Sequence, residues 1–264
     1  MARPNHPRRA KPTARSAPWR RDAAETVWLF GLHAVRDALM NPRREARRLI
    51  LSQNAALRLE EALAASALTP EIQDARRFDA PLDPQSVHQG AALECVPLDW
   101  GPLEGFAAEA AEIRRPLVAL DRVTDPHNVG AILRSAEVFG AAAVLAPRHH
   151  STPESGALAK TASGALERQP YLRVRNLGDA LETIKRAGHQ VVGLDGAAEE
   201  SLDALDTEGP PVCLVLGAEG PGMRARTREL CDRLVRITAF GPFGSLNVSN
   251  AAAVALYAVS KFQR

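Results

Sequence analysis

The 264-residue sequence lacks long apolar runs. No stretch approaches the roughly 20 apolar residues of a membrane-spanning helix, and the amino terminus has no apolar core that would mark a secretory signal. Its Arg-rich start has the composition of an organellar transit peptide, but Pro4, Pro7, Pro12 and Pro18 would break the amphipathic helix that such a peptide needs. We therefore expect a cytoplasmic protein that does not bind membranes.

Cysteine is scarce. Cys95, Cys213 and Cys231 are an odd number of cysteines without C-x-x-C spacing, which disfavours both a disulfide framework and a zinc site. We interpret them as small buried apolar residues in a reducing compartment. The seven histidines form no ligand pattern either, so we expect no metal.

Several catalytic signatures are also missing. A dinucleotide-dependent oxidoreductase would need G-x-G-x-x-G after the first strand of its sheet, where DRVTDPHNVG (121–130) has a single glycine. The sequence has no G-x-S-x-G, no H-E-x-x-H and no P-loop, and this disfavours a hydrolase.

The composition that remains is that of a globular protein, with 45% hydrophobic residues, 24% charged residues and a net charge of only +2. The charge is uneven, because residues 1–21 carry seven Arg or Lys and no acid. We expect residues 1–24 to form a disordered basic tail, which either contacts phosphates through charge alone or is a solvated extension.

The rest of the chain divides into two α/β units. Residues 25–98 predict a small domain, with a helical run from Trp28 that ends at Asn41-Pro42, a strand over 47–51, a helix over 57–67 and a strand over 92–96. Residues 99–115, which include Gly101-Pro102 and a short acidic helical segment, are expected to be a linker.

Residues 116–264 alternate apolar strands with helices. We predict strands at 116–121, 141–147, 190–195, 212–217 and 234–237, and helices at 129–139, 177–187, 223–233 and 248–262. Continuous apolar strands of this kind predict a parallel sheet that is covered on both faces. Ligands of such sheets bind beyond the carboxyl ends of the strands, so the loops there are the candidate site.

The first such loop follows strand 116–121. Asp125-Pro126 predicts a turn, Asn128 is a candidate N-cap, and Gly130 lets another segment or a ligand approach the helix. Arg134 lies one turn beyond Gly130 on the same side. A helix N-terminus beside a guanidinium suits a phosphate, although capping and a solvated arginine explain the same residues.

Two further loops carry polar residues among small ones. LGAEGPGM (216–223) has three glycines in six residues with Glu219 among them, and its structural alternative is a simple turn. In SLNVSN (245–250), Ser245, Asn247, Ser249 and Asn250 precede an Ala-rich helix, and four such residues exceed what capping requires.

Together these segments resemble the three motifs of the SpoU (TrmH-type) family of RNA ribose 2′-O-methyltransferases, within the SPOUT class. Asn128, Gly130 and Arg134 match the N-x-G-x-x-x-R spacing, and GAEGPGM and SLNVSNAAAV match the other two motifs. KTASGALE (160–167) resembles the family's segment between its first two motifs.

The amino-terminal unit extends the resemblance. FGLHAVRDAL (30–39) is similar to the opening of the small substrate-binding domain that many members carry, and the arrangement most resembles the 23S ribosomal RNA guanosine 2′-O-methyltransferases. One departure is Ile237-Thr238-Ala239, where members often have Ile-Pro-Met, which affects the loop around the cofactor.

The resemblance implies an α/β protein with a parallel-sheet SPOUT catalytic domain and a carboxyl-terminal trefoil knot, preceded by a small α/β substrate-binding domain. It implies a homodimer that acts on structured RNA with S-adenosylmethionine as methyl donor. In relatives the cofactor is held through main-chain groups, and this carries onto Gly217, Ile237 and Leu246, with Gly220 nearby.

Catalytic roles carry over in the same way. Family proposals make Arg134 the base that takes the ribose hydroxyl proton. A guanidinium keeps its proton at neutral pH and is a poor base, so phosphate gripping and alkoxide stabilisation by Arg134 fit equally well. Glu219 would orient Arg134, and the ribose and catalytic groups would be held by Asn128, Ser245 and Asn247.

Two other functions stay open. Transfer RNA is the alternative substrate, because the same catalytic domain serves both RNAs, and the front domain favours ribosomal RNA. A non-catalytic RNA-binding assembly factor is disfavoured by the presence of Asn128, Arg134 and Glu219.

Overall fold

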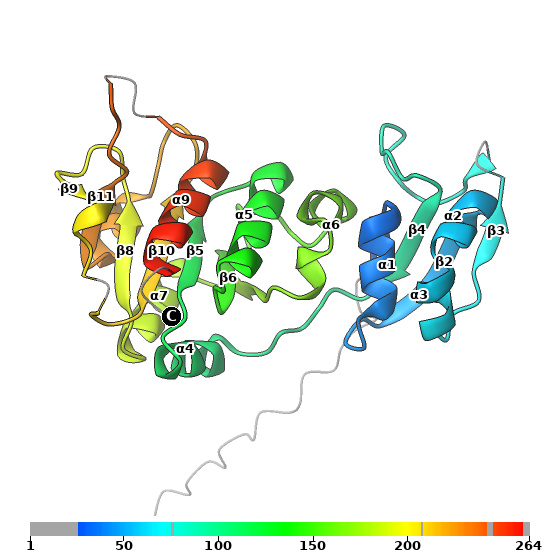
Figure 1. The fold of residues 1–264 in the computed structure, drawn as a ribbon, viewed down its shortest axis with the longest axis horizontal. Helices are drawn as coiled ribbons and strands as arrows, with labels where there is room; N and C mark the ends of the chain where they lie inside the picture. Colours follow the sequence, from blue (N-terminus) through cyan, green and yellow to red (C-terminus); the bar gives the residue numbers. More distant parts are fainter. Residues whose placement is uncertain (1–25, 75–76, 207, 242–244, 261–264) are drawn as a thin grey trace, which may run out of the picture.

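Two β-sheets organise the chain in the computed structural model (Figure 1). The structure describes residues 26–74, 77–206, 208–241 and 245–260, so the basic tail that we expected over 1–24 lies outside the described residues. One sheet is built from strands before residue 96 and the other from strands after residue 116.

The first sheet is small and mixed, in the order β1-β4-β2-β3. β4 is antiparallel to β1 and β2, and β3 is parallel to β2. Its elements are β1 (Val27–Phe30), α1 (Leu32–Met40), β2 (Ala46–Ser52), α2 (Gln53–Arg58), α3 (Glu60–Ala65), β3 (Glu71–Gln73) and β4 (Ala91–Cys95). The helical run that we expected from Trp28 starts instead as β1, and Gly31, with a φ of +92°, turns the chain into α1.

The second sheet has seven strands in the order β7-β6-β5-β10-β8-β11-β9. Every neighbouring pair in it is parallel, which confirms the predicted sheet. The strands are β5 (Leu117–Asp121), β6 (Ala143–Pro147), β7 (Tyr171–Val174), β8 (Gln190–Leu194), β9 (Glu200–Ser201), β10 (Val212–Gly217) and β11 (Arg233–Arg236).

Helices cover both faces of this sheet, so alternate strand residues enter two separate cores. Val118 and Leu120 of β5 pack into one core with α5 (Pro126–Val138), α6 (Gly156–Ala162) and α9 (Val248–Ser260). Leu117 and Ala119 pack into the other with α4 (Leu103–Glu112) and α7 (Leu177–Arg186), beside α8 (Ala225–Leu230). Burial on both faces explains why these strands are continuous apolar runs.

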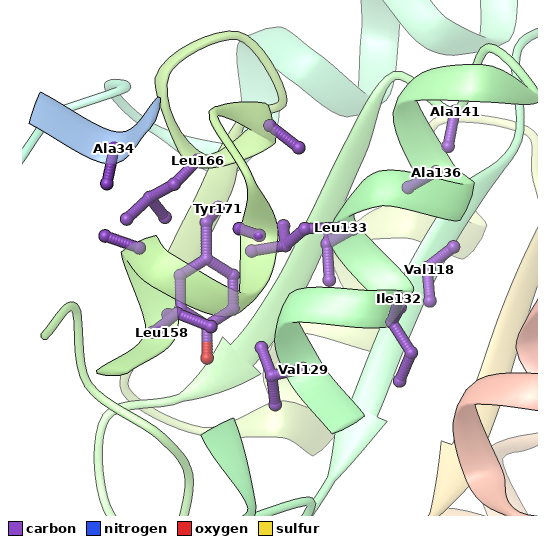
Figure 2. Packing of buried hydrophobic residues seen from close by; sticks show 14 of the residues in the cluster. Ala34, Val118, Val129, Ile132, Leu133, Ala136, Ala141, Leu158, Leu166 and Tyr171 are labelled. Carbon is purple, nitrogen blue, oxygen red and sulfur yellow. The ribbon is translucent and has the colours of Figure 1, made fainter. Parts of the chain in front are cut away.

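The first of these cores continues into the amino-terminal unit. Figure 2 shows Leu133 of α5, Leu158 of α6 and Ala34 of α1 within one cluster of buried side chains. α6 is the contact element, because it packs on β1 and α1 as well as on α5.

The segment 99–115 that we expected to be a linker is largely helical and packed. Ala107 and Ala110 of α4 are fully buried, and α4 contacts α7. The acidic helix that we expected is therefore a covering helix of the large sheet.

The part of the second unit without a predicted element, 148–176, contains α6 and β7. The helix predicted over 223–233 is shorter, because Met223 and Arg224 belong to the preceding loop and Arg233 begins β11. Cys95 and Cys213 are buried free thiols, which confirms their interpretation as packing residues, whereas Cys231 is half-buried and its thiol donates to the Thr227 carbonyl at 3.3 Å. Among the described helices, none has the length and apolar character that crossing a membrane requires.

Candidate active site at the carboxyl edge of the sheet

A pocket of about 920 Å³ opens where β8, β10 and β11 end. The carboxyl ends of parallel strands meet at one edge of a sheet, and the connections that follow these three strands form most of the pocket wall. Residues singled out from the sequence that line it are Gly217, Glu219, Gly220, Ile237, Ser245, Leu246 and Asn247.

The glycine loop after β10 folds back tightly on itself. Gly222 N–H donates to the Ala218 carbonyl at 2.9 Å, and these two residues form an isolated antiparallel bridge. A Cβ on Gly217 would lie 2.2 Å from the main chain of Gly222, so only glycine fits there. Gly220 has a φ of +81° and Gly222 one of +69°, the left-handed region that glycine favours. The loop therefore presents main-chain groups to the pocket.

A buried carboxylate anchors the far end of this loop. Asp121, the last residue of β5, is fully buried and accepts hydrogen bonds from Arg224 N at 2.9 Å and Arg224 Nε at 2.8 Å. β5 and β10 pair so that Asp121 lies opposite Gly217. Sequence reasoning did not assign Asp121 a role. The sequence signal that could have identified Asp121 is an acidic residue at the end of an otherwise apolar strand.

Three of the predicted catalytic side chains meet beside the pocket. Asn247 Nδ2 donates to Asn128 Oδ1 at 2.9 Å and also to Glu219 Oε1. Glu219 Oε1 accepts Val248 N–H as well, at 3.3 Å. Each of the three residues comes from a different motif, so the structure joins all three motifs in one polar cluster.

We expected Asn128 to cap α5, but the N-cap is Asp125. Asp125 Oδ1 accepts His127 N–H at 2.8 Å, and Pro126 occupies the first turn. Asn128 is thus inside the helix and buried, with its side chain turned to Asn247. Gly130 permits a close approach of α6, because a Cβ there would lie 2.7 Å from Thr161 Cβ.

Arg134 does not join this cluster within the chain. Its side chain is exposed on α5, and it has neither a hydrogen bond nor an ion pair with any residue that the structure describes. Within the chain, Glu219 orients Asn247 and the start of α9, and the role toward Arg134 that we expected for it stays a prediction. Ser245 is exposed at the pocket wall.

Asp195 and Arg228 also line the pocket, and sequence analysis did not predict either of them. Asp195, directly after β8, forms an ion pair with Arg228 of α8. Asp195 Oδ1 also accepts Ala197 N–H at 2.9 Å, which fixes the turn after β8. At the departure Ile237-Thr238-Ala239, Ile237 lines the pocket, and the Thr238 hydroxyl lies 2.8 Å from that of Ser201.

Comparisons with known proteins match both units. The family model described as the SpoU rRNA Methylase family matches residues 115–257, and the model described as RNA 2′-O ribose methyltransferase substrate binding matches residues 28–100.

Curated relatives match over most of the chain. A protein of Pseudomonas putida called 23S rRNA (guanosine-2′-O-)-methyltransferase RlmB is 40% identical over 87% of this chain and 94% of its own length. A Burkholderia protein of the same name is 44% identical over 78% of this chain and 83% of its own length. An uncharacterized tRNA/rRNA methyltransferase of Mycolicibacterium smegmatis is 36% identical over 99% of this chain and 86% of its own length.

Solved structures share the fold. The SpoU methyltransferase AviRb from Streptomyces viridochromogenes, in complex with AdoMet, is 22% identical with a TM-score of 0.75 over 89% of this chain and 90% of AviRb. An AdoMet-bound rRNA methyltransferase from Sinorhizobium meliloti is 24% identical with a TM-score of 0.72 over 89% and 87%. The chain therefore belongs to the SpoU rRNA methylase family of S-adenosylmethionine-dependent RNA 2′-O-ribose methyltransferases.

Proposed function

We propose that this protein transfers a methyl group from S-adenosylmethionine to the 2′-hydroxyl of a guanosine ribose in 23S ribosomal RNA. The observation that carries the proposal is the Asn128–Asn247–Glu219 cluster beside a pocket of main-chain groups. The RlmB relatives, which match this chain over most of their length, support the substrate.

The pocket suits the methyl donor. Its volume of about 920 Å³ lies inside the range of about 300–1,000 Å³ usual for small-molecule sites. Gly217, Gly220, Ile237 and Leu246 would hold the cofactor, the last two offering apolar surface. The carboxylate of Glu219 favours a cationic ligand, whereas the charge of Asp195 is balanced by Arg228. Bound there, S-adenosylmethionine supplies a methyl group on a sulfonium sulfur.

The chain's own residues must place a ribose oxygen in line with that methyl group. Positioning of two reactants supplies up to roughly 7–11 kcal/mol of a barrier. We propose that Asn128, Asn247 and Ser245 orient the ribose and that Glu219 fixes Asn247. Arg134 would take the hydroxyl proton or stabilise the developing alkoxide.

We propose a homodimer in which each site uses residues of both subunits. Val138 lies one turn beyond Arg134 on α5 and is 76% exposed, and Val254 and Tyr257 of α9, the helix that packs on α5, are exposed as well. Exposed apolar side chains on two packed helices favour a protein interface. Arg134 borders this surface, so it would reach the partner's site. We also propose that the carboxyl-terminal part of the catalytic domain forms the trefoil knot that the family resemblance implies.

The other parts of the chain would serve RNA binding in the cytoplasm. We propose that the unit over 25–98 contacts structured RNA, which the substrate-binding family match supports. The basic residues of 1–24 would add phosphate contacts whose strength falls with salt.

Mapping ribose methylation in cells with and without the gene tests the substrate. We expect one 2′-O-methyl mark to be missing from 23S ribosomal RNA. Loss confined to a transfer RNA would overturn the ribosomal assignment and keep the chemistry. If no mark is lost and the purified protein transfers no labelled methyl group to RNA, the chain is a binding factor.

A further inference from the structure

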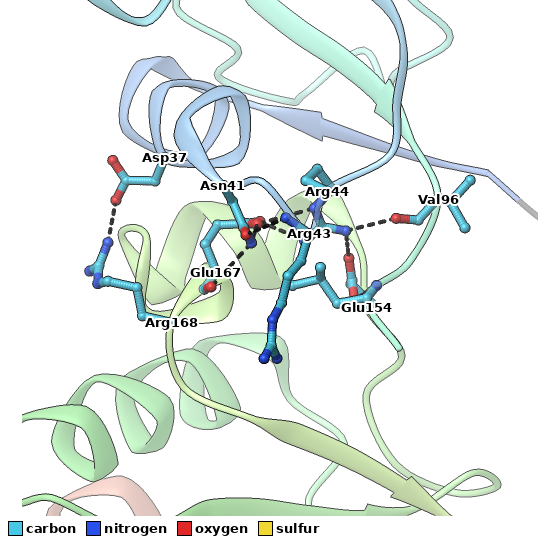
Figure 3. Close-up of polar contacts among 9 residues, drawn as sticks. Asp37, Asn41, Arg43, Arg44, Val96, Glu154, Glu167 and Arg168 are labelled. Atoms are coloured by element: carbon cyan, nitrogen blue, oxygen red, sulfur yellow. Dashed lines mark hydrogen bonds and ion pairs between the residues drawn. The ribbon is translucent and has the colours of Figure 1, made fainter. Parts of the chain in front are cut away.

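The two units meet across a cluster of buried charged side chains (Figure 3). Arg44, between α1 and β2, is its centre, and the side chain of Arg44 is 0% exposed. Its partners Glu154 and Glu167 come from the segment between β6 and β7, in the catalytic unit.

Each of the three guanidinium nitrogens of Arg44 donates at least one hydrogen bond. Nε and Nη2 donate to the two oxygens of Glu167 at 3.1 and 2.5 Å, and Nη1 donates to the Val96 carbonyl at 2.9 Å and to Glu154. Such a fork-to-fork pair fixes orientation as well as distance. Burial alone would lower the pKa of Arg44, but the hydrogen bond from Arg44 to Glu167 and the charges of both glutamates raise it overall, so the group stays charged.

Both glutamates are tied to the amino-terminal side by further bonds. Asn41 Nδ2 donates to Glu167 Oε2 at 2.8 Å and to the Glu167 carbonyl at 3.2 Å. Glu154 Oε2 accepts Leu98 N–H at 3.1 Å. The cluster therefore joins the turn after α1, the chain after β4 and two points of the catalytic unit.

Close backbone contacts surround the cluster. A Cβ on Gly164, whose φ is +88°, would lie 1.7 Å from Asp37 Oδ2, and one on Gly156 would lie 2.4 Å from the Phe30 ring. Arg168 Nη1 donates to Asp37 Oδ2 at 2.8 Å, a third ion pair between the units. Gly164 and Glu167 both belong to KTASGALE, a segment for which the proposed chemistry has no use.

A buried ion cluster defines one geometry more strictly than an apolar contact does. Its charges are desolvated, so losing one partner leaves another charge buried and uncompensated. Sliding or rotating the small unit would break the bidentate pair between Arg44 and Glu167, whereas apolar surfaces tolerate small shifts.

We propose that Arg44 and Glu167 are positioning residues that hold the substrate-binding unit in one orientation relative to the methyl-transfer pocket. The offset between the surface that grips the RNA and the pocket then selects which ribose is methylated. This inference rests on the proposed function, because it assigns the target choice of that same site.

The test compares Arg44→Met and Glu167→Gln with the wild-type protein. We expect the radius of gyration from small-angle X-ray scattering to rise in both variants. The KM for transcribed 23S ribosomal RNA should rise about tenfold or more, kcat should stay within threefold, and the Kd for S-adenosylmethionine should not change. Methylation mapping on that RNA should show additional ribose positions.

Arg48→Met is the matched control for scattering, because Arg48 forms a bidentate pair with Glu71 at 2.7 and 2.8 Å inside the small unit. Arg168→Met, at a half-exposed pair, is the variant to use if Arg44→Met does not fold.

Unchanged scattering and an unchanged KM in the folded variants would overturn the inference. If the wild-type protein methylates no RNA, the proposed function fails, while scattering still shows whether Arg44 holds the units together.

Discussion

Both polar atoms of the Asn247 side chain form hydrogen bonds. Its two amide hydrogens go to Asn128 and Glu219, and its Oδ1 accepts Ser249 N–H at 2.9 Å and the Ser249 hydroxyl. These contacts leave only one orientation for the amide. Asn247 therefore caps the start of α9 and also joins the other two motifs.

Asn247→Asp should lower kcat for methyl transfer by about 30- to 100-fold. The exchange removes both donors and places a second carboxylate beside Glu219, and hydrogen bonds to charged groups contribute about 1.5–3 kcal/mol. Labelled methyl incorporation into RNA measures the effect. Ser249→Ala is the control, because it leaves both donated bonds of Asn247 in place. A kcat within threefold of wild type would contradict the role of Asn247.

Arg134→Ala should abolish turnover and leave the Kd for S-adenosylmethionine within a few-fold, because Arg134 does not line the cofactor pocket. Single-turnover methylation and calorimetry separate the two effects. Arg186→Ala, at an exposed arginine of α7 on the other face of the sheet, is the control. Near-normal methylation by Arg134→Ala would remove Arg134 from the mechanism.

Gly217→Ala should weaken S-adenosylmethionine binding by more than tenfold. The new methyl group would lie 2.2 Å from Gly222 C, so the glycine loop must open. Calorimetric titration measures the Kd. In Gly105→Ala the added Cβ meets nothing within 4 Å, so that variant should bind normally. Equal affinities for the two variants would contradict the fit of the loop around the cofactor.

At the scale of elements, the strands of the large sheet were the most predictable part of the fold. Their apolar runs are continuous because both faces are buried, and burial leaves a direct mark on composition. β7 is an edge strand of four residues, Tyr171–Val174, half of them only partly buried, and α6 has seven mostly small residues. Neither element has a periodic pattern, because tertiary contacts define both.

The candidate site was predictable in its residue types and less so in its contacts. Asn128, Glu219 and Asn247 were expected to act together, and they do meet. Asp121 could not be assigned, because its partner Arg224 depends on the pairing of β5 with β10, strands far apart in sequence. Asp125 and Asn128 are both capping residue types, and only the helix start distinguishes them.

Gly130→Ala should destabilise the protein by about 1–3 kcal/mol, the usual cost of adding a methylene group to a well-packed contact. The added Cβ would meet Thr161 and the main chain of Ala162, and α5 would be pushed away from α6. Urea unfolding gives the free energy of unfolding. Gly105→Ala again serves as the control, and its stability should not fall. If Gly130→Ala were equally stable, the α5–α6 contact would be looser than described.

At the scale of the whole molecule, the exposed apolar surface of α5 and α9 carries the dimer proposal. Val138→Glu and Val254→Glu should each convert a dimer into a monomer and lower methyl transfer at least tenfold, because a buried charge opposes association. Sedimentation gives the mass of each variant. Leu57→Glu, at an exposed leucine of α2 in the small unit, should leave the mass unchanged. A wild-type protein that sediments as a monomer would contradict the proposal.

The place of β10 in the sheet has a consequence for synthesis. β10 lies between β5 and β8, although both of those strands precede it in the chain. Until residues 212–217 have left the ribosome, each of these strands has a side with unsatisfied backbone groups, a template for pairing with other chains. Nascent chains that stall before this point are thus the aggregation-prone species, and quality control must protect or remove them.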